Sequence, residues 1–326
     1  MSMFSLIFTM GFRSPYVGVD DFNYMRIYDN VNHLSTAQYY QQNVTEPGYY
    51  ILNKLVYLVF DDFQWLIIIV TFFTVFCFYK ALAYEIENIS LAMAVFIFAT
   101  TQYFYYFGIV RLGIAVAIIS VAYRYIIRNQ KKKFLLLVLL ATLFHYSALF
   151  SLILLFARPN YLKGIKKDRI LKLAIIVPIS FIFIKFFIYP FVVTDRYSNY
   201  MESSDVISLG FITSMPFFIL SLIFFSRLDN KFRNYNFYVL LYSIKLFTEI
   251  FSPLVGIGRM VWYVNLSLSF LLPGIIKNST DRLSKFLVFV LTILFCVVYA
   301  YTSYFGDSSR GDFMLPYKTF FFDNLK

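Results

Sequence analysis

The sequence predicts an all-α polytopic integral membrane protein. The chain of 326 residues is 60% hydrophobic and only 14% charged, whereas soluble domains carry about 25% charged residues. Its mean hydropathy is +0.68, and its apolar residues gather in blocks long enough to cross a bilayer as helices. These observations exclude a soluble enzyme, a secreted module and a disordered tail. We expect a single transmembrane domain over residues 1–326.

Apolar runs of about 17 to 25 residues define the expected membrane spans. They lie near residues 63–84, 88–107, 108–127, 172–193, 209–226, 236–255, 260–276 and 286–304. Two further apolar segments, 1–12 and 48–60, are too short to cross, and we expect 48–60 to form a short non-spanning helix. Counting such partial segments, the chain has about 9–10 membrane segments.

Residues 134–156 are apolar and long enough to cross, but basic clusters flank them on both sides. A simple span would place one cluster outside, against the tendency of Lys and Arg to stay inside. A re-entrant helical hairpin that turns near His145 keeps both clusters inside, and irregular backbone is tolerated where it lines a protein cavity. With the hairpin 18 Lys and Arg lie inside and 9 outside, against 16 and 11 with a span. We therefore expect a hairpin near 134–156.

The net charge of +11 follows from this arrangement. The loops predicted inside carry +13, those predicted outside carry −3, and Lys185, Lys245 and Glu249 within spans add +1. The basic character therefore reflects topology, and nucleic acid is not an expected partner. Loops 13–62 and 194–208 and the C-terminal tail 305–326 are expected on the outer, periplasmic side. The aromatic tail segment 315–320 is expected to fold back on the protein.

Motifs of soluble enzymes and metal proteins are missing from the sequence. It has no Walker loop, no GxGxxG and no HExxH, and His33 and His145 are its only histidines. Cys77 and Cys296 lie inside apolar blocks without a CxxC, which gives neither a metal motif nor a disulfide signal. We expect no metal and no cofactor.

Three arginines mark the outer ends of predicted spans, namely Arg111, Arg196 and Arg259. Guanidinium groups bind phosphate and diphosphate through paired hydrogen bonds, so arginines at one membrane level favour a diphosphate-binding site. The alternative is that each is an anchor whose charged end reaches the membrane surface.

Other polar residues allow two interpretations each. His145 is either a buried histidine with satisfied hydrogen bonds or a general base or hydrogen-bond donor. Lys245 and Glu249 stand four residues apart, which favours a structural ion pair within a span. The first outer loop is rich in Asp, Glu, Tyr and Asn, which suits a sugar-binding surface but is also usual for a solvated loop.

Several segments occur in an order that resembles a known family. These are Gly18-Val-Asp20 with Tyr24, Glu46-Pro-Gly48-Tyr49, Arg111-Leu-Gly-Ile-Ala115, Phe144-His145-Tyr-Ser-Ala-Leu149, Arg259 with Tyr263, and Pro316-Tyr317. In this order, and with this topology, the chain resembles EpsG/Wzy-type polysaccharide polymerases over nearly its whole length. It departs from the family pattern at Asp21, where an aromatic residue usually stands, and in its short first apolar segment, where a full span usually precedes the loop.

The resemblance implies an O-antigen or capsule repeat-unit polymerase of lipopolysaccharide biosynthesis in the bacterial cytoplasmic (inner) membrane. Such a glycosyltransferase moves the growing glycan from undecaprenyl diphosphate onto the non-reducing end of a new lipid-linked repeat unit at the periplasmic face. The implied partners are that lipid-linked oligosaccharide, the bilayer and a chain-length regulator. The implied site comprises His145, Asp20 and Glu46 for the acceptor hydroxyl, Arg111, Arg259 and Arg196 for the diphosphate, and Tyr24, Tyr49, Tyr263 and Tyr317 for the substrate.

Three alternatives fit the composition less well. A membrane O-acyltransferase also combines a buried histidine with arginines, but its acyl donor would come from the cytoplasmic side. A transporter or flippase predicts internal repeats or paired broken helices, and the sequence shows no repeat. A ligase that transfers finished polymer to lipid A would be expected to carry a much longer periplasmic loop.

Overall fold

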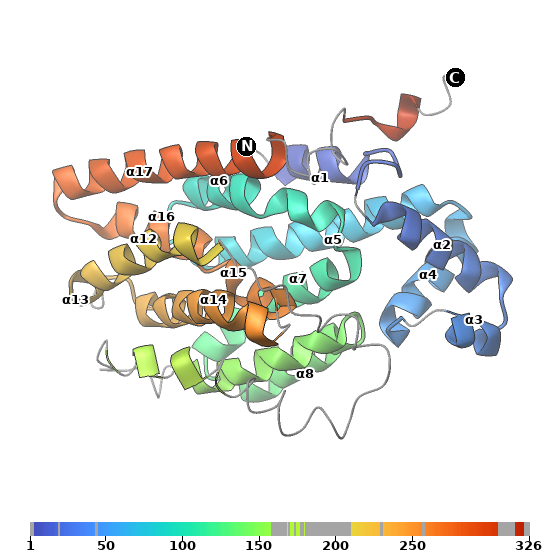
Figure 1. Ribbon diagram of the computed structural model, residues 1–326, viewed down its shortest axis with the longest axis horizontal. Helices are drawn as coiled ribbons and strands as arrows, with labels where there is room; N and C mark the ends of the chain where they lie inside the picture. The colour runs from blue at the N-terminus through green and yellow to red at the C-terminus, as the bar shows by residue number, and fades with distance from the viewer. Residues whose placement is uncertain are drawn as a thin grey trace.

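The computed structural model is helical throughout the residues that it describes (Figure 1). These are 3–18, 20–42, 45–157, isolated positions between 168 and 179, 210–228, 231–255, 258–305 and 317–322. Within them no strand forms, and a single isolated bridge pairs Arg13 with Thr319. The all-α class predicted from composition is confirmed.

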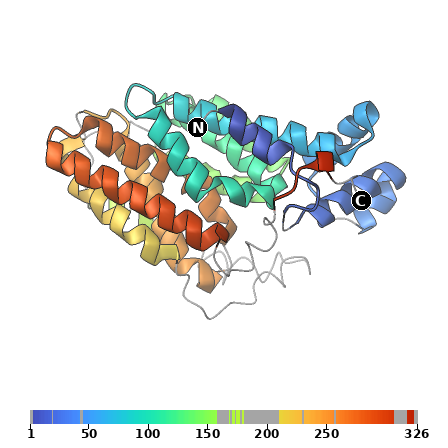
Figure 2. The same ribbon diagram turned by 90° about the horizontal axis from the view of Figure 1, so that it is seen from above.

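The predicted spans that fall on described residues are helices, and they lie side by side as one bundle (Figures 1 and 2). The four stretches long and apolar enough to cross a membrane are Phe63–Ala83, Val110–Ile127, Gly258–Asn278 and Arg282–Tyr304. The first two are α5 and α7, and α17 (Arg282–Ala300) forms most of the last. The bundle also contains α6 (Leu91–Thr101), η1 (Tyr103–Phe107), α12 (Gly210–Ile223), α13 (Phe225–Leu228) and α14 (Tyr235–Val255). Most of the predicted span 172–193 lies outside the described residues.

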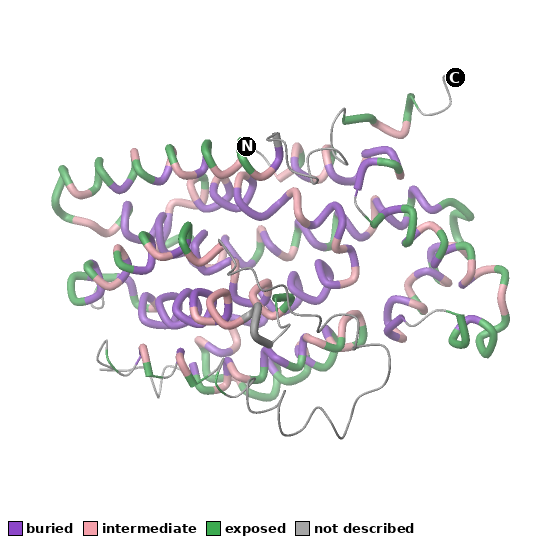
Figure 3. Tube along the Cα trace, viewed as in Figure 1, coloured by how far each residue is buried: buried purple, intermediate pink, exposed green. Residues whose placement is uncertain are grey.

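Helix α17 shows how an apolar sequence places a helix at the edge of the bundle. Val288, Thr292 and Cys296 are buried and recur every four residues, so they form one stripe that faces the other helices. Most of the remaining large apolar residues, including Phe286 and Leu291, are exposed (Figure 3). An exposed apolar surface of this extent on a helix of span length suits contact with lipid.

The stretch Gly258–Asn278 crosses the bundle as a broken helix. It consists of η5 (Gly258–Val261), α15 (Trp262–Asn265) and α16 (Leu268–Asn278). Such breaks are tolerated at membrane depth where other parts of the protein satisfy the backbone.

The predicted hairpin is confirmed. Helix α8 (Lys131–Thr142) and the 3-10 helix η2 (Tyr146–Ala157) pack against each other, so the chain reverses direction between them near His145. The 12 residues of α8 extend about 18 Å, which is short of the roughly 30 Å hydrocarbon core. Leu136 and Leu139 of α8 are exposed, as are Leu149 and Phe156 of η2, which places the hairpin on the outside of the bundle.

Three helices form a cap at one end of the bundle, on the right in Figure 1. They are α2 (Asp21–His33), α3 (Thr36–Gln42) and α4 (Pro47–Phe60). Helix α4 is the predicted short helix, and its 14 residues extend only about 21 Å. The residue after the helix, Asp61, ends it with a left-handed φ of 46°. The short helix α1 (Met3–Gly11) packs along α5.

The connections α13–α14 and α16–α17 lie at the opposite end, on the left in Figure 1. The buried Glu85 carboxylate ties that end together by accepting hydrogen bonds from Asn88 and Asn234 at 2.6 Å and from Tyr238 at 3.0 Å. Burial raises its pKa, and these donors oppose the rise. The ammonium of Lys277 donates to the Ile86 carbonyl at 2.8 Å. The basic loops at 227–233 and 277–285, predicted inside, thus share the end opposite α2–α4.

The C-terminal tail folds back onto the N-terminal segment, as predicted. The Ser14 N–H donates to the Lys318 carbonyl at 2.9 Å, and the Phe320 N–H donates to the Phe12 carbonyl at 3.2 Å. The Phe12 ring stacks on Phe320 with centroids 5.9 Å apart. Tyr317 donates its hydroxyl to the Thr9 carbonyl at 2.6 Å. The tail therefore belongs to the same end of the molecule as α2–α4.

A buried ion pair that the sequence did not reveal anchors this end. Arg13 and Asp21 are 1% and 0% exposed, and two guanidinium nitrogens reach the two carboxylate oxygens at 3.2 Å each. Arg13 also donates to the carbonyls of Met10, Val17 and Phe107. Burial raises the pKa of Asp21, and Arg13 opposes the rise. The pair explains why a carboxylate at position 21 is accommodated here in place of an aromatic ring.

Replacing Arg13 with alanine leaves the Asp21 carboxylate buried without its counter-charge. We expect the free energy of unfolding to fall by about 3–5 kcal/mol, the usual cost of removing one partner of a buried ion pair. Denaturant titration of the purified protein in mixed micelles measures it. Arg26→Ala removes an exposed arginine of α2 and should cost no more than about 0.5 kcal/mol. Equal losses for the two variants would contradict the role of the pair.

Candidate functional site

Glu46 and Arg111 form an ion pair at the end of the bundle that carries α2–α4. Arg111 Nη1 lies 2.6 Å from Glu46 Oε2, although the residues are 65 positions apart in the chain. Glu46 is the residue before α4. The helix begins at Pro47, and proline is well suited to the first turn of a helix. Arg111 is the second residue of α7. Glu46 is buried, whereas 18% of the Arg111 side chain is exposed, so the guanidinium retains an accessible edge.

His145 stands at the tip of the hairpin and belongs to a short hydrogen-bonded chain. Its Nδ1 lies 2.7 Å from Ser147 Oγ, which in turn lies 2.9 Å from the Tyr263 hydroxyl. The Ser147 N–H also donates to Nδ1 at 3.3 Å. Because an N–H can only donate, Nδ1 is the acceptor, and the neutral imidazole carries its proton on Nε2. His145 therefore offers an N–H donor at Nε2.

Gly48 brings the hairpin tip against the start of α4. The Gly48 N–H donates to the Leu143 carbonyl at 2.8 Å. A Cβ at this position would lie 2.7 Å from that oxygen, closer than real Cβ contacts, so only glycine allows this approach. The contact holds the segments that carry Glu46 and His145 together. Tyr263 of α15 bonds to Ser147 at this tip, which brings the broken helix to the same place.

Tyr24 and Tyr49 pack behind the ion pair. Both are buried, and their rings meet edge to face with centroids 5.9 Å apart. Burial raises the pKa of both hydroxyls, and the nearby Arg111 charge opposes the rise. These tyrosines contact the site from the protein side, so their rings support Arg111 and are not exposed as a platform for a sugar.

The remaining predicted residues lie in different surroundings. Asp20 is exposed at the start of α2, within electrostatic reach of Tyr24. Arg259 is exposed on η5. Tyr317 is in the tail and bonds to the first helix, and Arg196 lies outside the described residues. The structure thus joins Glu46, Arg111, His145 and Tyr263 into one cluster, which we call the outer cluster, with Arg259 and Asp20 near it.

Sequence reasoning missed Ser147, which links His145 to Tyr263. Its position two residues after a histidine at a chain reversal was the available signal, because hydroxyls often bond locally at such turns. It also missed the hydroxyl pair of Tyr39 and Thr45, 2.6 Å apart and buried just before Glu46. These are short-range contacts whose partners only become evident once the backbone is placed.

Lys245 and Glu249 form the expected ion pair within α14. Lys245 Nζ lies 2.6 Å from Glu249 Oε1 and 2.6 Å from Ser214 Oγ of α12. The pair lines a cavity that is separate from the outer cluster. No group of three His, Cys, Asp or Glu side chains in the described parts of the chain is arranged to hold a metal ion.

The outer cluster combines a carboxylate, a guanidinium and a histidine donor in a partly buried place. Arg111 Nε is buried and has no hydrogen-bond partner among the described residues. Nε lies beside the buried Tyr24 side chain, so an anion would approach the exposed part of the Arg111 side chain. A cation and an N–H donor beside a carboxylate can stabilise a departing anion and orient or deprotonate a hydroxyl.

Comparison with known proteins gives one match. A sequence model of the EpsG family matches residues 1–319. No curated protein and no solved structure matches the chain.

The Gly48 contact can be tested by adding one methyl group. Gly48→Ala drives a Cβ into the Leu143 carbonyl, and overpacking of this kind usually costs about 1–3 kcal/mol. We expect the free energy of unfolding in mixed micelles to fall by that amount. Gly11→Ala meets only ordinary contacts at 3.5 Å and should cost less. If both variants are equally stable, the hairpin tip does not depend on this contact.

Proposed function

Because the chain belongs to the EpsG family, we propose that it is a membrane glycosyltransferase that polymerises lipid-linked oligosaccharide repeat units. The family and the multi-pass helical fold fit a role in polysaccharide biosynthesis. The finer proposal is an O-antigen or capsule polymerase at the outer face of the bacterial cytoplasmic membrane. Its donor would be a glycan carried on undecaprenyl diphosphate, and a chain-length regulator would be its partner.

The observation that carries this proposal is the outer cluster. Glu46, Arg111 and His145 come from three segments far apart in sequence and meet at one end of the long apolar helices. A lipid-linked substrate enters an active site from the bilayer, and its diphosphate lies at the membrane surface. A guanidinium at the end of a span is therefore placed at the depth of the leaving group.

The proposed reaction breaks the bond between the anomeric carbon and the diphosphate oxygen of the donor. The acceptor hydroxyl oxygen forms the new bond to that carbon, and its proton passes to a base. Negative charge develops on the departing diphosphate, where the guanidinium groups of Arg111 and Arg259 would stabilise it. Preorganised donors of this kind are worth about 10²–10³ in rate.

Glu46 would act as the proton acceptor, and His145 would act as a hydrogen-bond donor. Glu46 Oε2 is engaged by Arg111, so Oε1 is the proposed acceptor of the hydroxyl proton. His145 accepts from Ser147 at Nδ1, and its proposed role is to donate a hydrogen bond from Nε2 to the diphosphate or to a sugar hydroxyl. In this assignment His145 is a hydrogen-bond donor, and Ser147 and Tyr263 position it.

Loss of a charged residue of the outer cluster, or of Arg259 near it, should stop polymerisation without preventing insertion. In a deletion strain, plasmid-borne Arg111→Ala, Arg259→Ala or Glu46→Gln should give lipopolysaccharide with a single repeat unit, a fall in chain extension of about 10²-fold or more. The readout is a lipopolysaccharide gel with the amount of protein in membranes checked by immunoblot. Arg128→Ala, at the other end of α7, is the matched control and should keep the full ladder.

The gel also separates the alternatives. A polymerase defect keeps the one-unit product, whereas a defect in a ligase or flippase removes O-antigen from the core altogether. Full ladders from all three cluster variants would refute the assigned site.

The chain's two histidines offer a second matched pair. His145→Ala removes the Nε2 donor at the hairpin tip, while His33→Ala removes an exposed ring that contacts the Asp29 carbonyl. We expect the first to reduce chain extension about 10²-fold, in the range for a positioned proton-transfer or donor group, and the second to leave the ladder unchanged. Ser147→Ala should give an intermediate ladder, because the imidazole loses its positioning partner. Identical ladders from His145→Ala and His33→Ala would contradict the role.

A further inference from the structure

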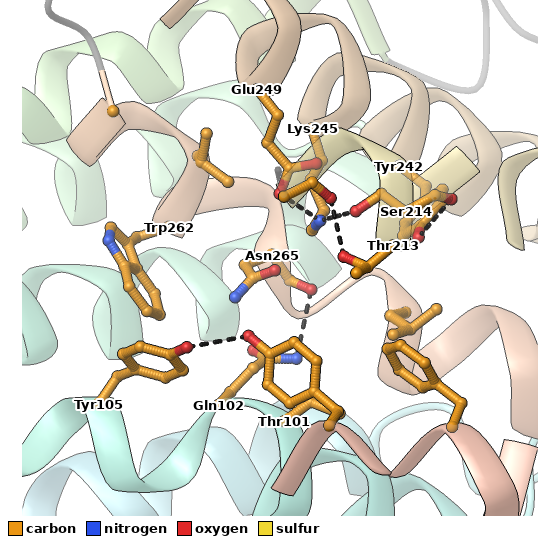
Figure 4. A pocket seen from close by; sticks show the side chains of 16 residues that line it. Thr101, Gln102, Tyr105, Thr213, Ser214, Tyr242, Lys245, Glu249, Trp262 and Asn265 are labelled. Atoms are coloured by element: carbon orange, nitrogen blue, oxygen red, sulfur yellow. Dashed lines mark hydrogen bonds and ion pairs between the residues drawn. The ribbon is translucent and has the colours of Figure 1, made fainter. Parts of the chain in front are cut away.

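A polar cavity of about 370 Å³ lies inside the bundle beside the outer cluster (Figure 4). It is enclosed by the end of α6 with η1, the start of α12, the second half of α14, the broken helix η5–α15 and α17. Its volume falls in the range of small-molecule sites. Neither the diphosphate role nor the proton-transfer role uses this cavity.

We propose that this cavity is a binding subsite for an uncharged sugar ring of the substrate glycan, an inference that rests on the proposed function. Hydrogen-bonding side chains cover several walls, among them Gln102, Thr213, Ser214 and Asn265. Aromatic rings cover another wall. This combination matches a pyranose, which presents hydroxyls at its rim and C–H groups on its faces.

The charges of the cavity favour a neutral ligand. Its only facing cation and anion among the lining residues are Lys245 and Glu249, which pair with each other at 2.6 Å. Lys245 Nζ also donates a hydrogen bond to Ser214 Oγ. The two charges cancel, so the cavity offers no net attraction to a phosphate. The polar walls equally disfavour an isoprenoid chain, because burying polar groups against hydrocarbon is costly.

Gln102 supplies the second observation that points to a ligand. Its side chain is 1% exposed, and its amide nitrogen donates to the Asn265 carbonyl at 3.3 Å. Its Oε1 is buried and has no hydrogen-bond partner among the residues that the structure describes. A buried acceptor without a donor is rare in native proteins, and a sugar hydroxyl is a donor that would satisfy it.

The aromatic wall is preorganised. The rings of Tyr105 and Trp262 lie 5.1 Å apart between centroids, and the Tyr105 hydroxyl is 3.0 Å from the Tyr299 hydroxyl. Figure 4 shows Trp262 and Tyr105 together on one side of the cavity and Lys245 with Glu249 on another. Rigid aromatic rings bury a large apolar area at little entropic cost, which suits the C–H face of a sugar.

Helix α15 separates the cavity from the outer cluster. Tyr263 bonds to Ser147 on the side of the cluster, whereas its neighbour Trp262 lines the cavity. Consecutive helical residues point about 100° apart, and a helix is about 10 Å wide. The cavity and the outer cluster therefore lie on two sides of α15, next to each other in the protein.

Tryptophan fluorescence provides a direct test, because the chain has two tryptophans. Trp65 stacks on Phe60 at the start of α5, and Trp65→Phe leaves Trp262 as the single reporter. The protein is reconstituted in nanodiscs, since detergents with sugar head groups would compete. The probes are the lipid-free repeat-unit oligosaccharide, released by mild acid, and inorganic diphosphate. Calorimetry under the same conditions measures binding independently of the fluorescence.

The oligosaccharide should change Trp262 fluorescence saturably, and inorganic diphosphate should not. Gln102→Leu should raise the Kd for the oligosaccharide about 3- to 10-fold, the effect of one hydrogen bond. Gln64→Leu is the matched control: Gln64 is also buried with an unpartnered Oε1, but it contacts Gly11 and Arg13 instead. It should leave the Kd unchanged.

Three results would overturn the inference: no oligosaccharide binding by either method, an equal response to inorganic diphosphate, or a wild-type Kd for Gln102→Leu. The outcomes also separate it from the proposed function. If the oligosaccharide does not bind but the cluster variants lose their ladders, the cavity inference fails and the polymerase stands. If the oligosaccharide binds but deletion of the gene leaves the ladder intact, the polymerase fails and the sugar site stands.

Discussion

The ion pair between Glu46 and Arg111 couples the cap of short helices to the membrane bundle. Arg111 stands at the start of a span and Glu46 at the start of α4, and their side chains meet at 2.6 Å with the carboxylate buried. In this low-dielectric place neither charge is tolerated without the other. The position of α4 follows from the pair, and with it the contact of Gly48 with the hairpin tip that brings His145 to the same cluster.

Two other buried cations are also held by a carboxylate partner. Arg13 is held by Asp21 and three carbonyls beneath the cap, and Lys245 is held by Glu249 and Ser214 within the bundle. Arg111 is also paired, with Glu46, but it stands at the start of a span, whereas the Lys245–Glu249 pair lies within the bundle. The position of each pair is why we assign the anionic leaving group to the outer cluster and a neutral sugar to the cavity.

Much of the architecture was predictable because it depends on local properties. Apolar run length identified α5, α7 and α17, and the basic clusters on both sides of 134–156 indicated the hairpin. The clustering of Glu46, Arg111, His145 and Tyr263 was proposed through a family resemblance, and the structure brings these four together. Asp20 and Tyr317 do not belong to this cluster, because Asp20 is exposed and Tyr317 bonds to the first helix.

The sequence by itself determined the membrane-embedded helical class, the reversal of the chain near His145 and the residue types of the site. Hydrophobicity and charge are properties of single residues and short windows, so they can be read without coordinates. Only the tertiary structure decided which buried charges meet, since Arg13 with Asp21 and Arg111 with Glu46 are pairs chosen by packing. It also decided that Trp262 lines the cavity while Tyr263 meets the outer cluster, because α15 lies between the two and its consecutive side chains point about 100° apart.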